Sequence, residues 1–552
     1  MKKTYVKPIN LFVIITLLYI SFISIIGQLH GGVNWGDDLV YHLARIEGIT
    51  NAIKLNQLPA YIHSNILNGY GYGSGFFYPN FLLYIPSIFR LIGISVNTSY
   101  KIFLLIINIL TSLSIYLSTK YITKNKYSSL LASILFVLCQ YRIVNIYVRS
   151  AVGEFCAMTF IPIVICGLYD LLHNDFKKPW ILSLGFLGLI LTHTITLFIG
   201  IIIAIIAVII NIKTFITNLK LIYKLFLTAL CTILISSFYW MPFLEQCMAD
   251  AFSFSIQRAL LSYYMVSIYK FFLDIRWISV GIPLIIICFL RFFVPKEVSS
   301  KNRELIKILD LYLIAGIILC LLCTTLIPWK SFEHTIINNI QFPWRLLSFA
   351  SCFLSISSAL LLNFTFKESY KAPLFMFILL ITTAFSSIIM IPSVLNLVNY
   401  KFNKQSSFWI GNGEWLPLGT DKDKLFDTKP CVLDENNNSI DFNKNGYTVT
   451  FNNKNCPESN YYTIPLLYYK GYCATITTNN GTKELRIEKG DNNLVKVINN
   501  DKFVGNVTVT YSNTIMQKLS ILISLISLVT IDIIYLIFKY KKVKSIDNNH
   551  NK

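Results

Sequence analysis

Charged side chains are scarce in this sequence. Only 14% of its 552 residues are Asp, Glu, Lys or Arg, whereas 54% are hydrophobic. A soluble protein carries charge on about a quarter of its residues, so the composition excludes an ordinary soluble domain. Long apolar runs make up much of the sequence, and they indicate a protein that crosses a membrane several times.

Several other features are missing as well. The sequence has no glycine-rich nucleotide-binding motif, no internal repeat and no low-complexity tract. The first apolar run, 8–28, lacks a small-x-small cleavage site and is long enough to span, so we interpret it as an uncleaved first helix. The basic residues behind the formal charge of +20 cluster in the short links between apolar runs. This distribution is typical of the cytoplasmic loops of membrane proteins and does not indicate nucleic-acid binding. Among the 12 cysteines, three lie in a polar region where at most one pair could form a disulfide: Cys431, Cys456 and Cys473.

The apolar runs predict about twelve transmembrane helices. They lie near 8–28, 101–122, 128–148, 155–172, 180–193, 195–212, 222–241, 277–294, 306–328, 346–366, 371–391 and 515–539. A further run, 79–95, is barely long enough to cross. If it lies on the surface as an amphipathic helix, every basic link faces the cytoplasm, as the positive-inside rule requires. We therefore expect cytoplasmic termini and an external first loop, 29–100, that contains this surface helix.

Residues 392–514 follow a different pattern. Their β-branched stretches, such as 447–451 and 507–511, are separated by Asn, Gly and Asp turns. This pattern predicts an external β-sandwich between the last two helices. The expected organisation is a transmembrane domain (1–391), an external β-domain (392–514), and a last transmembrane helix with a basic cytoplasmic tail (515–552).

Charge reappears where the first apolar run ends. Asp37 and Asp38 are adjacent, and a helix starting near Asp38 would present Asp38, His42 and Arg45 on one face. Burying such groups costs several kcal/mol unless they bind something. The alternative is a solvated loop end in which an aspartate caps the following helix.

The predicted topology brings four more polar residues to the outer face: Arg149, Glu154, His193 and Arg345. Loops that converge on a rigid scaffold commonly build a site. Each residue also has a structural interpretation. Glu154 is favoured at a helix start, Arg149 could reach towards the interface, His193 could be a buried hydrogen-bonded residue, and Arg345 could be an interface anchor.

An aromatic, glycine-rich loop lies in the same external region. Tyr70, Tyr72 and Tyr78 alternate with glycines over 69–75. Such a loop could stack on sugar rings or close over a bound lipid. The alternative is an aromatic belt at the membrane interface joined by a glycine turn.

These elements in this order resemble the glycosyltransferase-C superfamily, polytopic enzymes that use polyprenyl-phosphate donors at the outer membrane face. Five motifs carry a closer resemblance: Asp38-Leu-Val-Tyr-His42-Leu-Ala-Arg45, Tyr70-Gly-Tyr-Gly-Ser-Gly-Phe-Phe-Tyr-Pro79, Arg149-Ser-Ala-Val-Gly-Glu154, Leu191-Thr-His193-Thr and Thr463-Ile-Pro-Leu-Leu-Tyr-Tyr-Lys-Gly471-Tyr. The first four are similar to a bacterial membrane family labelled 6-pyruvoyl-tetrahydropterin synthase-related, although the zinc-binding histidines of the soluble pterin enzyme are absent. The fifth is similar to the external β-domain of YfhO-type membrane proteins.

The resemblance implies sugar transfer from a polyprenyl-phosphate-linked lipid to a cell-envelope polymer, at the outer face of the plasma membrane. It implies that Asp38 is the base or a metal ligand, with Asp37 as second choice and Glu154 as a further site carboxylate. Substrate would contact His42, Arg45, Arg149, His193 and Arg345, with the cations holding the departing phosphate. No cofactor is certain, but Asp38 and Glu154 could hold a divalent metal.

Two alternatives remain open at this point. A transporter or flippase of lipid-linked saccharides would use a similarly polytopic chain, but transporters tend to place ionisable groups at mid-membrane. A non-catalytic scaffold that presents the β-domain would leave Asp38 and Glu154 without a purpose.

Overall fold

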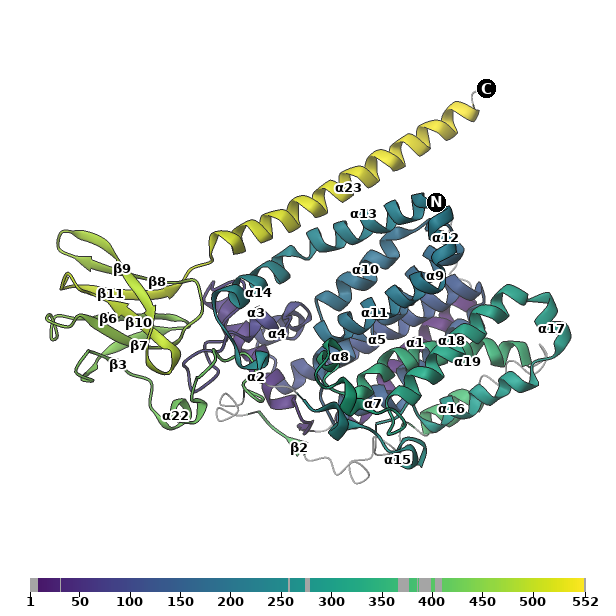
Figure 1. Cartoon of the computed structure of the whole chain (residues 1–552), viewed down its shortest axis with the longest axis horizontal. Helices are drawn as coiled ribbons and strands as arrows, with labels where there is room; N and C mark the ends of the chain where they lie inside the picture. Colours follow the sequence, from purple (N-terminus) through teal and green to yellow (C-terminus); the bar gives the residue numbers. More distant parts are fainter. Residues whose placement is uncertain are drawn as a thin grey trace.

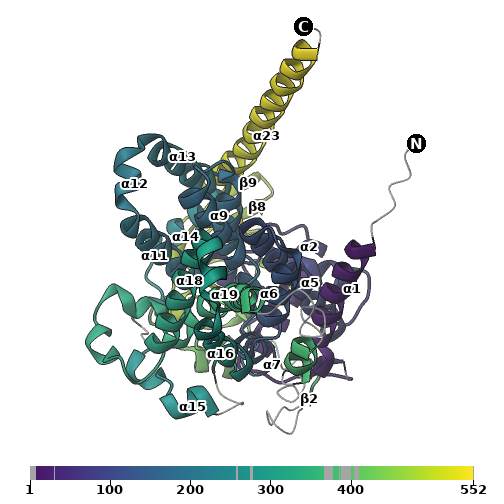
Figure 2. The ribbon, with the colours of Figure 1, turned by 90° about the vertical axis from the view of Figure 1, so that its right-hand side faces the viewer.

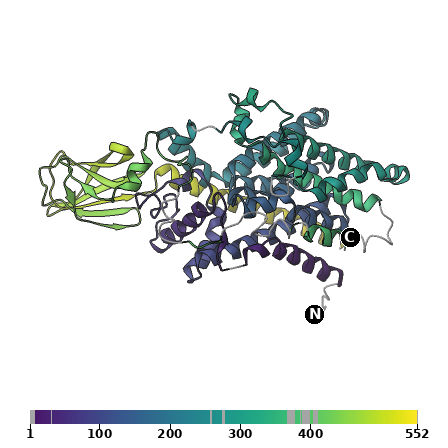
Figure 3. The ribbon, with the colours of Figure 1, turned by 90° about the horizontal axis from the view of Figure 1, so that it is seen from below.

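A computed structural model describes residues 8–29, 31–256, 259–273, 278–365, 377–384, 386, 399–402 and 410–550. A bundle of helices forms one end of the molecule and a β-domain the other (Figure 1). Helix α23 (Ile515–His550) runs back from the β-domain along the side of the bundle, where it packs on α13 (Leu219–Ile235) and α14 (Ser237–Ala249). Seen from below, the start of α1 (Pro8–Ile23) and the far end of α23 lie on the side away from the β-domain (Figure 3). The predicted combination of apolar helices with a β-domain before the last helix is confirmed.

Five helical segments in the described part of the chain are long and apolar enough to cross a membrane: 96–123, 152–173, 303–322, 343–362 and 515–533. Two further predicted spans are bent helix pairs. The pair α6 (Lys126–Val137) and α7 (Gln140–Tyr147) bends by 41°, and the pair α13 (Leu219–Ile235) and α14 (Ser237–Ala249) bends by 71°. Counting each pair as one span gives up to seven in the described residues.

The other predicted spans form shorter helices: α1 (Pro8–Ile23), α10 (Pro179–Ile190), α11 (Thr194–Ile210) and α16 (Ile282–Cys288) with the 3-10 turn η5 (Phe289–Phe293). The 12 residues of α10 reach only about 18 Å, well short of a hydrocarbon core about 30 Å thick. Most of the run 371–391 lies outside the described residues. The number of about twelve spans stays a prediction.

The bundle is built around α19 (Leu347–Thr365), which Figure 2 shows next to α6 near the centre. Its neighbours are α5 (Val96–Thr123), α9 (Ile161–His173) and α18 (Arg303–Leu322). Five serines of α19 are fully buried: Ser348, Ser351, Ser355, Ser357 and Ser358. Small side chains let helices approach closely within a membrane, which explains how a serine-rich helix occupies the centre.

The segment predicted as a surface helix forms η2 (Phe81–Leu83) and α4 (Tyr84–Leu91). These 11 residues would reach about 16 Å as a helix, too short to cross a bilayer. Helix α4 packs on α2 (Leu39–Lys54) and α5 and leaves Ile88 exposed. The guanidinium of Arg90 pairs at 2.5 Å with Glu47 of α2, so this ion pair joins the two helices.

The β-domain is one sheet of nine strands in the order β4-β3-β7-β10-β9-β8-β11-β6-β5. Strand β9 joins its two halves, because Gly481–Leu485 pair with β8 whereas Arg486–Lys489 pair with β10. Alternate residues point inwards, so that Val449, Ile476 and Val509 form the core between the halves. The strand bounds are Val432–Leu433 (β3), Ser439–Ile440 (β4), Phe442–Asn445 (β5), Thr448–Asn452 (β6), Tyr461–Leu467 (β7), Tyr472–Thr478 (β8), Gly481–Lys489 (β9), Leu494–Ile498 (β10) and Asn506–Tyr511 (β11).

The aromatic, glycine-rich loop is a docking element for this domain. Tyr70 and Tyr72 are buried, so the loop is neither an open flap nor an aromatic belt at the membrane surface. The ring of Phe76 lies 5.8 Å from the ring of Tyr469 in the β-domain. A Cβ atom at Gly73 would lie 2.5 Å from the same tyrosine ring. Glycine is needed there because the loop backbone lies directly against the β-domain.

Candidate functional site

The first acidic loop is hydrogen-bonded to the link between α7 and α8 (Val152–Ala157). The amides of Asp37 and Asp38 donate to the carbonyls of Val148 and Arg149, each at 3.0 Å. Asp38 stands at the N-cap of α2 (Leu39–Lys54), but its side chain makes no capping hydrogen bond. The carboxylate is therefore not used as a helix cap.

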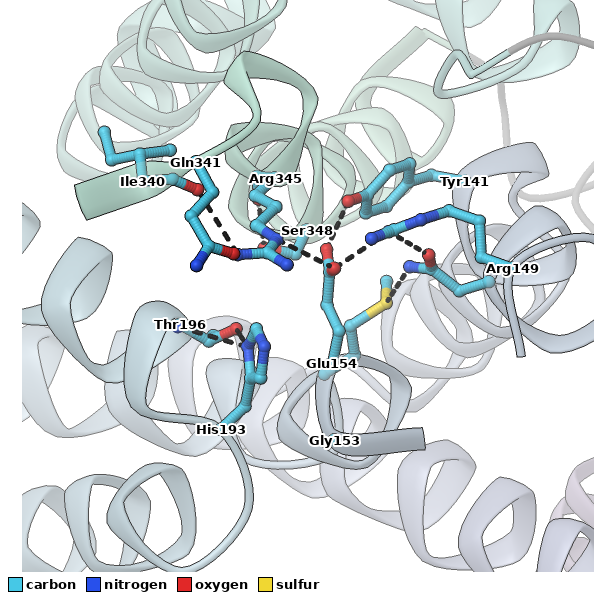
Figure 4. A network of polar contacts seen from close by, with 12 residues as sticks. Tyr141, Arg149, Gly153, Glu154, His193, Thr196, Ile340, Gln341, Arg345 and Ser348 are labelled. Carbon is cyan, nitrogen blue, oxygen red and sulfur yellow. Dashed lines mark hydrogen bonds and ion pairs between the residues drawn. The ribbon is translucent and has the colours of Figure 1, made fainter. Parts of the chain in front are cut away.

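Glu154 lies at the centre of a buried ionic network (Figure 4). Its carboxylate accepts hydrogen bonds from the Tyr141 hydroxyl and, at 2.8 Å, from Nη1 of Arg149. Nε of Arg345 lies 3.6 Å from the same carboxylate. One negative charge thus sits between two guanidinium groups, and the group of three carries a net positive charge.

Arg345 connects this network to a cavity. It lies in η8 (Pro343–Leu346), and its Nη1 donates to the side chain of Gln341 at 2.8 Å. His193 faces the same region, where its Nδ1 accepts the amide of Thr196 at 3.3 Å and so caps α11 (Figure 4). The structural interpretation of His193 as a hydrogen-bonded residue holds, and its ring also lines the cavity.

The cavity has a volume of about 780 Å³. Its wall combines carboxylates, cationic and amide groups, and aromatic rings. The carboxylates are Asp37, Asp38 and Glu414; the other polar groups include His42, His193, Asn338, Gln341, Arg345 and Asn412; and the aromatic rings are Tyr41, Phe77, Tyr78, Phe198, Phe243, Phe254 and Trp415. Arg149, Glu154 and Arg45 do not line it.

The cavity walls change the acidity of its carboxyl groups. Asp38 opens into the cavity, but the surrounding protein removes water and raises the pKa of this carboxyl to about 6. Arg149 opposes that shift, whereas the neighbouring charge of Asp37 adds to it. Burial also raises the pKa of Glu414 and of Asp37. A carboxyl group that titrates near pH 6 can exchange a proton with substrate near neutral pH.

Arg45 does not reach the cavity as the helical spacing suggested. The residue lies two turns into α2 and is fully buried. Its Nη2 donates to the carbonyl of Pro79 at 2.8 Å and to the side chain of Asn80 at 2.7 Å, while Nη1 lies 3.3 Å from Nδ1 of His42. Arg45 therefore holds the end of the aromatic loop behind the cavity wall, and of the predicted trio only Asp38 and His42 face the cavity.

Sequence reasoning missed the contribution of residues 410–415. This segment lies in the range assigned to the β-sandwich, yet Glu414 and Trp415 line the cavity. The indole ring is stacked with the rings of Tyr78 at 5.5 Å and Tyr41 at 5.8 Å. The sequence feature that could have identified this segment is the acidic–aromatic pair Glu414-Trp415 directly after two glycines. Both glycines, Gly411 and Gly413, have a positive φ in the structure.

The residues do not fit the divalent metal that Asp38 and Glu154 were expected to hold. Tyr141, Arg149 and Arg345 already surround the Glu154 carboxylate. In the part of the chain that the structure describes, no group of three or more His, Cys, Asp or Glu side chains could bind a metal ion. The three cysteines of the polar region, Cys431, Cys456 and Cys473, are free thiols.

Comparison with known proteins gives the following relationships. No protein-family profile matches the chain. An uncharacterised protein of Lactococcus lactis subsp. cremoris (strain MG1363) is 24% identical over 257 residues, which make up 45% of this chain and 42% of that protein. Among solved structures, the mycobacterial arabinofuranosyltransferase AftD has a TM-score of 0.44 at 13% identity, over 70% of this chain and 27% of that one. The oligosaccharyltransferase AglB of Archaeoglobus fulgidus has a TM-score of 0.41 at 12% identity, over 71% and 56%. The chain thus spans less than two thirds of the length of each of these proteins.

Proposed function

We propose that this chain is a membrane glycosyltransferase that transfers a sugar from a polyprenyl-phosphate-linked donor to a cell-envelope acceptor. The observation that carries the proposal is one cavity with a carboxyl group suited to proton transfer, Asp38, and a guanidinium group, Arg345. Sugar transfer from a phosphate donor needs a proton acceptor at one oxygen and a cation at another.

In the proposed step, the acceptor hydroxyl gives its proton to the Asp38 carboxylate while its oxygen attacks the anomeric carbon. The bond between that carbon and the phosphate oxygen breaks, and the electron pair leaves with the polyprenyl phosphate. The guanidinium of Arg345 binds the departing anion. Arg149 and Glu154 hold Arg345 in place from behind, since Glu154 pairs with both cations.

A second cavity supports a lipid-linked donor. It has a volume of about 820 Å³ and lies among α9, α10, α11, α13 and α14, where most of its lining side chains are apolar. Thr194 and Phe243 line both cavities, so the two lie side by side. A hydrocarbon tail in the apolar cavity would leave its phosphate at the polar one, near Arg345.

We also propose that the polar cavity opens at the outer face of the plasma membrane, with the β-domain outside and both termini in the cytoplasm. The distribution of basic links supports this orientation. The position of the start of α1 and the far end of α23, on the side away from the β-domain, agrees with it (Figure 3).

A transporter or flippase of lipid-linked saccharides is the second candidate. The two bent helix pairs favour it, because transporters place their sites at broken helices. The polar cavity, however, is lined by the first loop, the start of α11, the segment 410–415, η7 (Ile336–Ile340) and η8. Helix α14 adds Phe243, but the breaks in the two bent pairs, at 138–139 and 236, do not line this cavity. This position favours the enzyme.

The test is sugar transfer from a polyprenyl-phosphate donor by the full chain in reconstituted membranes. Asp38→Asn keeps the shape of the side chain and removes the base, so turnover should fall about 10²–10⁴-fold while donor binding persists. Asp501→Asn, on the surface of the β-domain, is the matched control and should keep the parental rate. Transfer at the parental rate by Asp38→Asn would show that Asp38 is not the base. If the parent moves the donor across the membrane without transferring its sugar, the transporter is the correct function.

A further inference from the structure

The segment 410–418, here called the strap, fastens the β-domain to the helical bundle. The amides of Ser253 and Phe254 donate to the carbonyls of Leu416 and Glu414 at 2.9 and 2.8 Å. The amide of Leu418 donates to the carbonyl of Ala251 at 2.8 Å. The strap is thus paired with the loop that follows α14.

The other side of the strap is held by two tyrosines. The amide of Trp415 donates to the hydroxyl of Tyr72 in the aromatic loop at 3.1 Å. The hydroxyl of Tyr469 in the β-domain donates to the carbonyl of Trp415, also at 3.1 Å. These two bonds hold the backbone at Trp415, and its side chain lines the cavity.

The strap presents an aromatic ring beside polar groups. Trp415 is half-buried, and its ring plane lies within 26° of Tyr41 and 22° of Tyr78, so the three rings form a continuous wall. Next to this wall, the side-chain amide of Asn412 donates to the carboxylate of Glu414 at 3.3 Å. The Glu414 charge also influences the ionisation of Asp38, which indicates that the two carboxyl groups share one part of the cavity.

This combination suits a sugar. The apolar C–H face of a sugar ring packs well on a large rigid aromatic surface, and its hydroxyls need acceptors at the edge of that surface. A carboxylate accepts several such hydrogen bonds, and a few polar groups placed in an aromatic wall give orientation. A lipid acceptor would have no use for Glu414 and Asn412, and the neighbouring apolar cavity already suits the donor tail.

We propose that the strap forms the acceptor subsite and that the acceptor is a saccharide, one ring of which packs on Trp415 while a hydroxyl donates to Glu414. The inference rests on the proposed function and names its acceptor class. The bound ring is held so that another hydroxyl of the acceptor reaches the Asp38 carboxylate, which takes its proton. Trp415 and Glu414 are positioning residues in this arrangement.

The experiment measures binding of two probes to the full chain in lipid nanodiscs. One probe is a set of hexasaccharides of glucose, galactose, mannose and N-acetylglucosamine. The other is undecaprenyl phosphate. The variants are Trp415→Ala, Trp415→Phe and Glu414→Gln. The matched controls are Trp180→Ala, at an indole 61% exposed at the start of α10, and Glu488→Gln, at a half-exposed carboxylate in β9.

We expect the parent to bind at least one hexasaccharide. Trp415→Ala should raise the Kd of that saccharide about tenfold, the usual cost of truncating an aromatic anchor. Glu414→Gln should raise the Kd by about the same factor, because it replaces the charged acceptor of the proposed hydrogen bond. Trp415→Phe should lose less, because it keeps an aromatic face. Undecaprenyl phosphate should bind all variants equally, which also shows that they are folded. The two controls should match the parent in both measurements.

Other outcomes overturn the inference in distinguishable ways. Parental saccharide affinity in both Trp415→Ala and Glu414→Gln would show that the strap is not the subsite. If the parent binds undecaprenyl phosphate but no hexasaccharide, the acceptor is not a saccharide and the proposed function stands. If it binds neither probe, both proposals fail.

Discussion

The backbone amide of Asp38 donates a hydrogen bond to the carbonyl of Arg149 at 3.0 Å. This contact joins the acidic first loop to the link that carries the Arg149–Glu154 ion pair. The proposed base and the cationic network behind Arg345 are therefore positioned by one piece of backbone. A change that separates these two segments should disturb proton transfer and phosphate binding together.

Gly36 tests this backbone contact. A Cβ atom at position 36 would lie 2.2 Å from Oγ of Ser150 and 2.9 Å from the carbonyl oxygen of Val148. We expect Gly36→Ala to cost about 1–3 kcal/mol of stability and to lower sugar transfer. The measurements are the melting temperature in detergent and the transfer rate.

The same loop offers a control and a rescue for Gly36→Ala. Gly31→Ala should be harmless, because nothing lies within 4 Å of the added Cβ. Ser150→Gly in the Gly36→Ala background removes the nearest side chain and suits the φ of 49° at position 150, so it should restore part of the stability. Equal damage from Gly31→Ala, or no recovery in the double variant, would contradict the contact.

We expect Glu154 to contribute more to the stability of the folded protein than to the rate of sugar transfer. Glu154→Gln leaves two buried guanidinium groups without their shared counter-charge, and breaking a buried pair typically costs about 3–5 kcal/mol. Glu47→Gln, which breaks the more exposed pair with Arg90, should cost about 1 kcal/mol or less. Denaturant unfolding in mixed micelles measures both. A Glu154→Gln variant as stable as Glu47→Gln would refute the role of the network.

The rate should depend on pH through Asp38. The pKa of this carboxyl is raised to about 6, so it is protonated below that pH and kcat/KM should rise as the pH increases through about 6. Asp37→Asn removes a negative charge that raises the Asp38 pKa, so the midpoint should move to lower pH. Asp501→Asn serves as the control with an unchanged midpoint. A midpoint that Asp37→Asn leaves in place would exclude Asp38 as the titrating base.

The same pKa shift has a consequence for stability. Because the Asp38 pKa in the folded protein lies above the ordinary value of 3.8, ionisation opposes folding as the pH rises from about 4 through 6. Asp38→Asn should therefore melt at a higher temperature than the parent at pH 7, and this advantage should vanish near pH 4. A variant that melts below the parent at pH 7 would contradict the shift.

The orientation of the chain can be tested with two exposed positions. Cys473 is exposed on β8 and should react with a membrane-impermeant maleimide added to intact cells. A cysteine at Lys124, which is exposed after α5, should react only once the membrane is permeabilised. The Lys124→Cys variant carries Cys473→Ser, and Cys431 and Cys456 are replaced by serine in both proteins. Labelling of both positions from the same side would overturn the proposed orientation.

Local sequence patterns anticipated much of the fold. Helices form most of the described residues of the predicted spans, because uninterrupted apolar runs have one favourable conformation in lipid. The bend between α6 and α7 was not predicted. Helix α7 carries Arg142, whose Nε and Nη2 donate to the Asn108 side chain on α5 at 3.1 and 3.0 Å. That partner is distant in sequence, so no local pattern reveals it.

The sequence by itself determined the membrane class, several of the β-strands and the presence of Asp37 and Asp38 at the end of the first apolar run, because hydropathy and period are local properties. The tertiary structure alone decided which side chains meet. It turned Arg45 inwards against the aromatic loop, buried Glu154 between two cations, and brought Glu414 and Trp415 to the cavity of Asp38. These placements depend on backbone pairing and packing between segments far apart in the chain, which no short stretch of residues encodes.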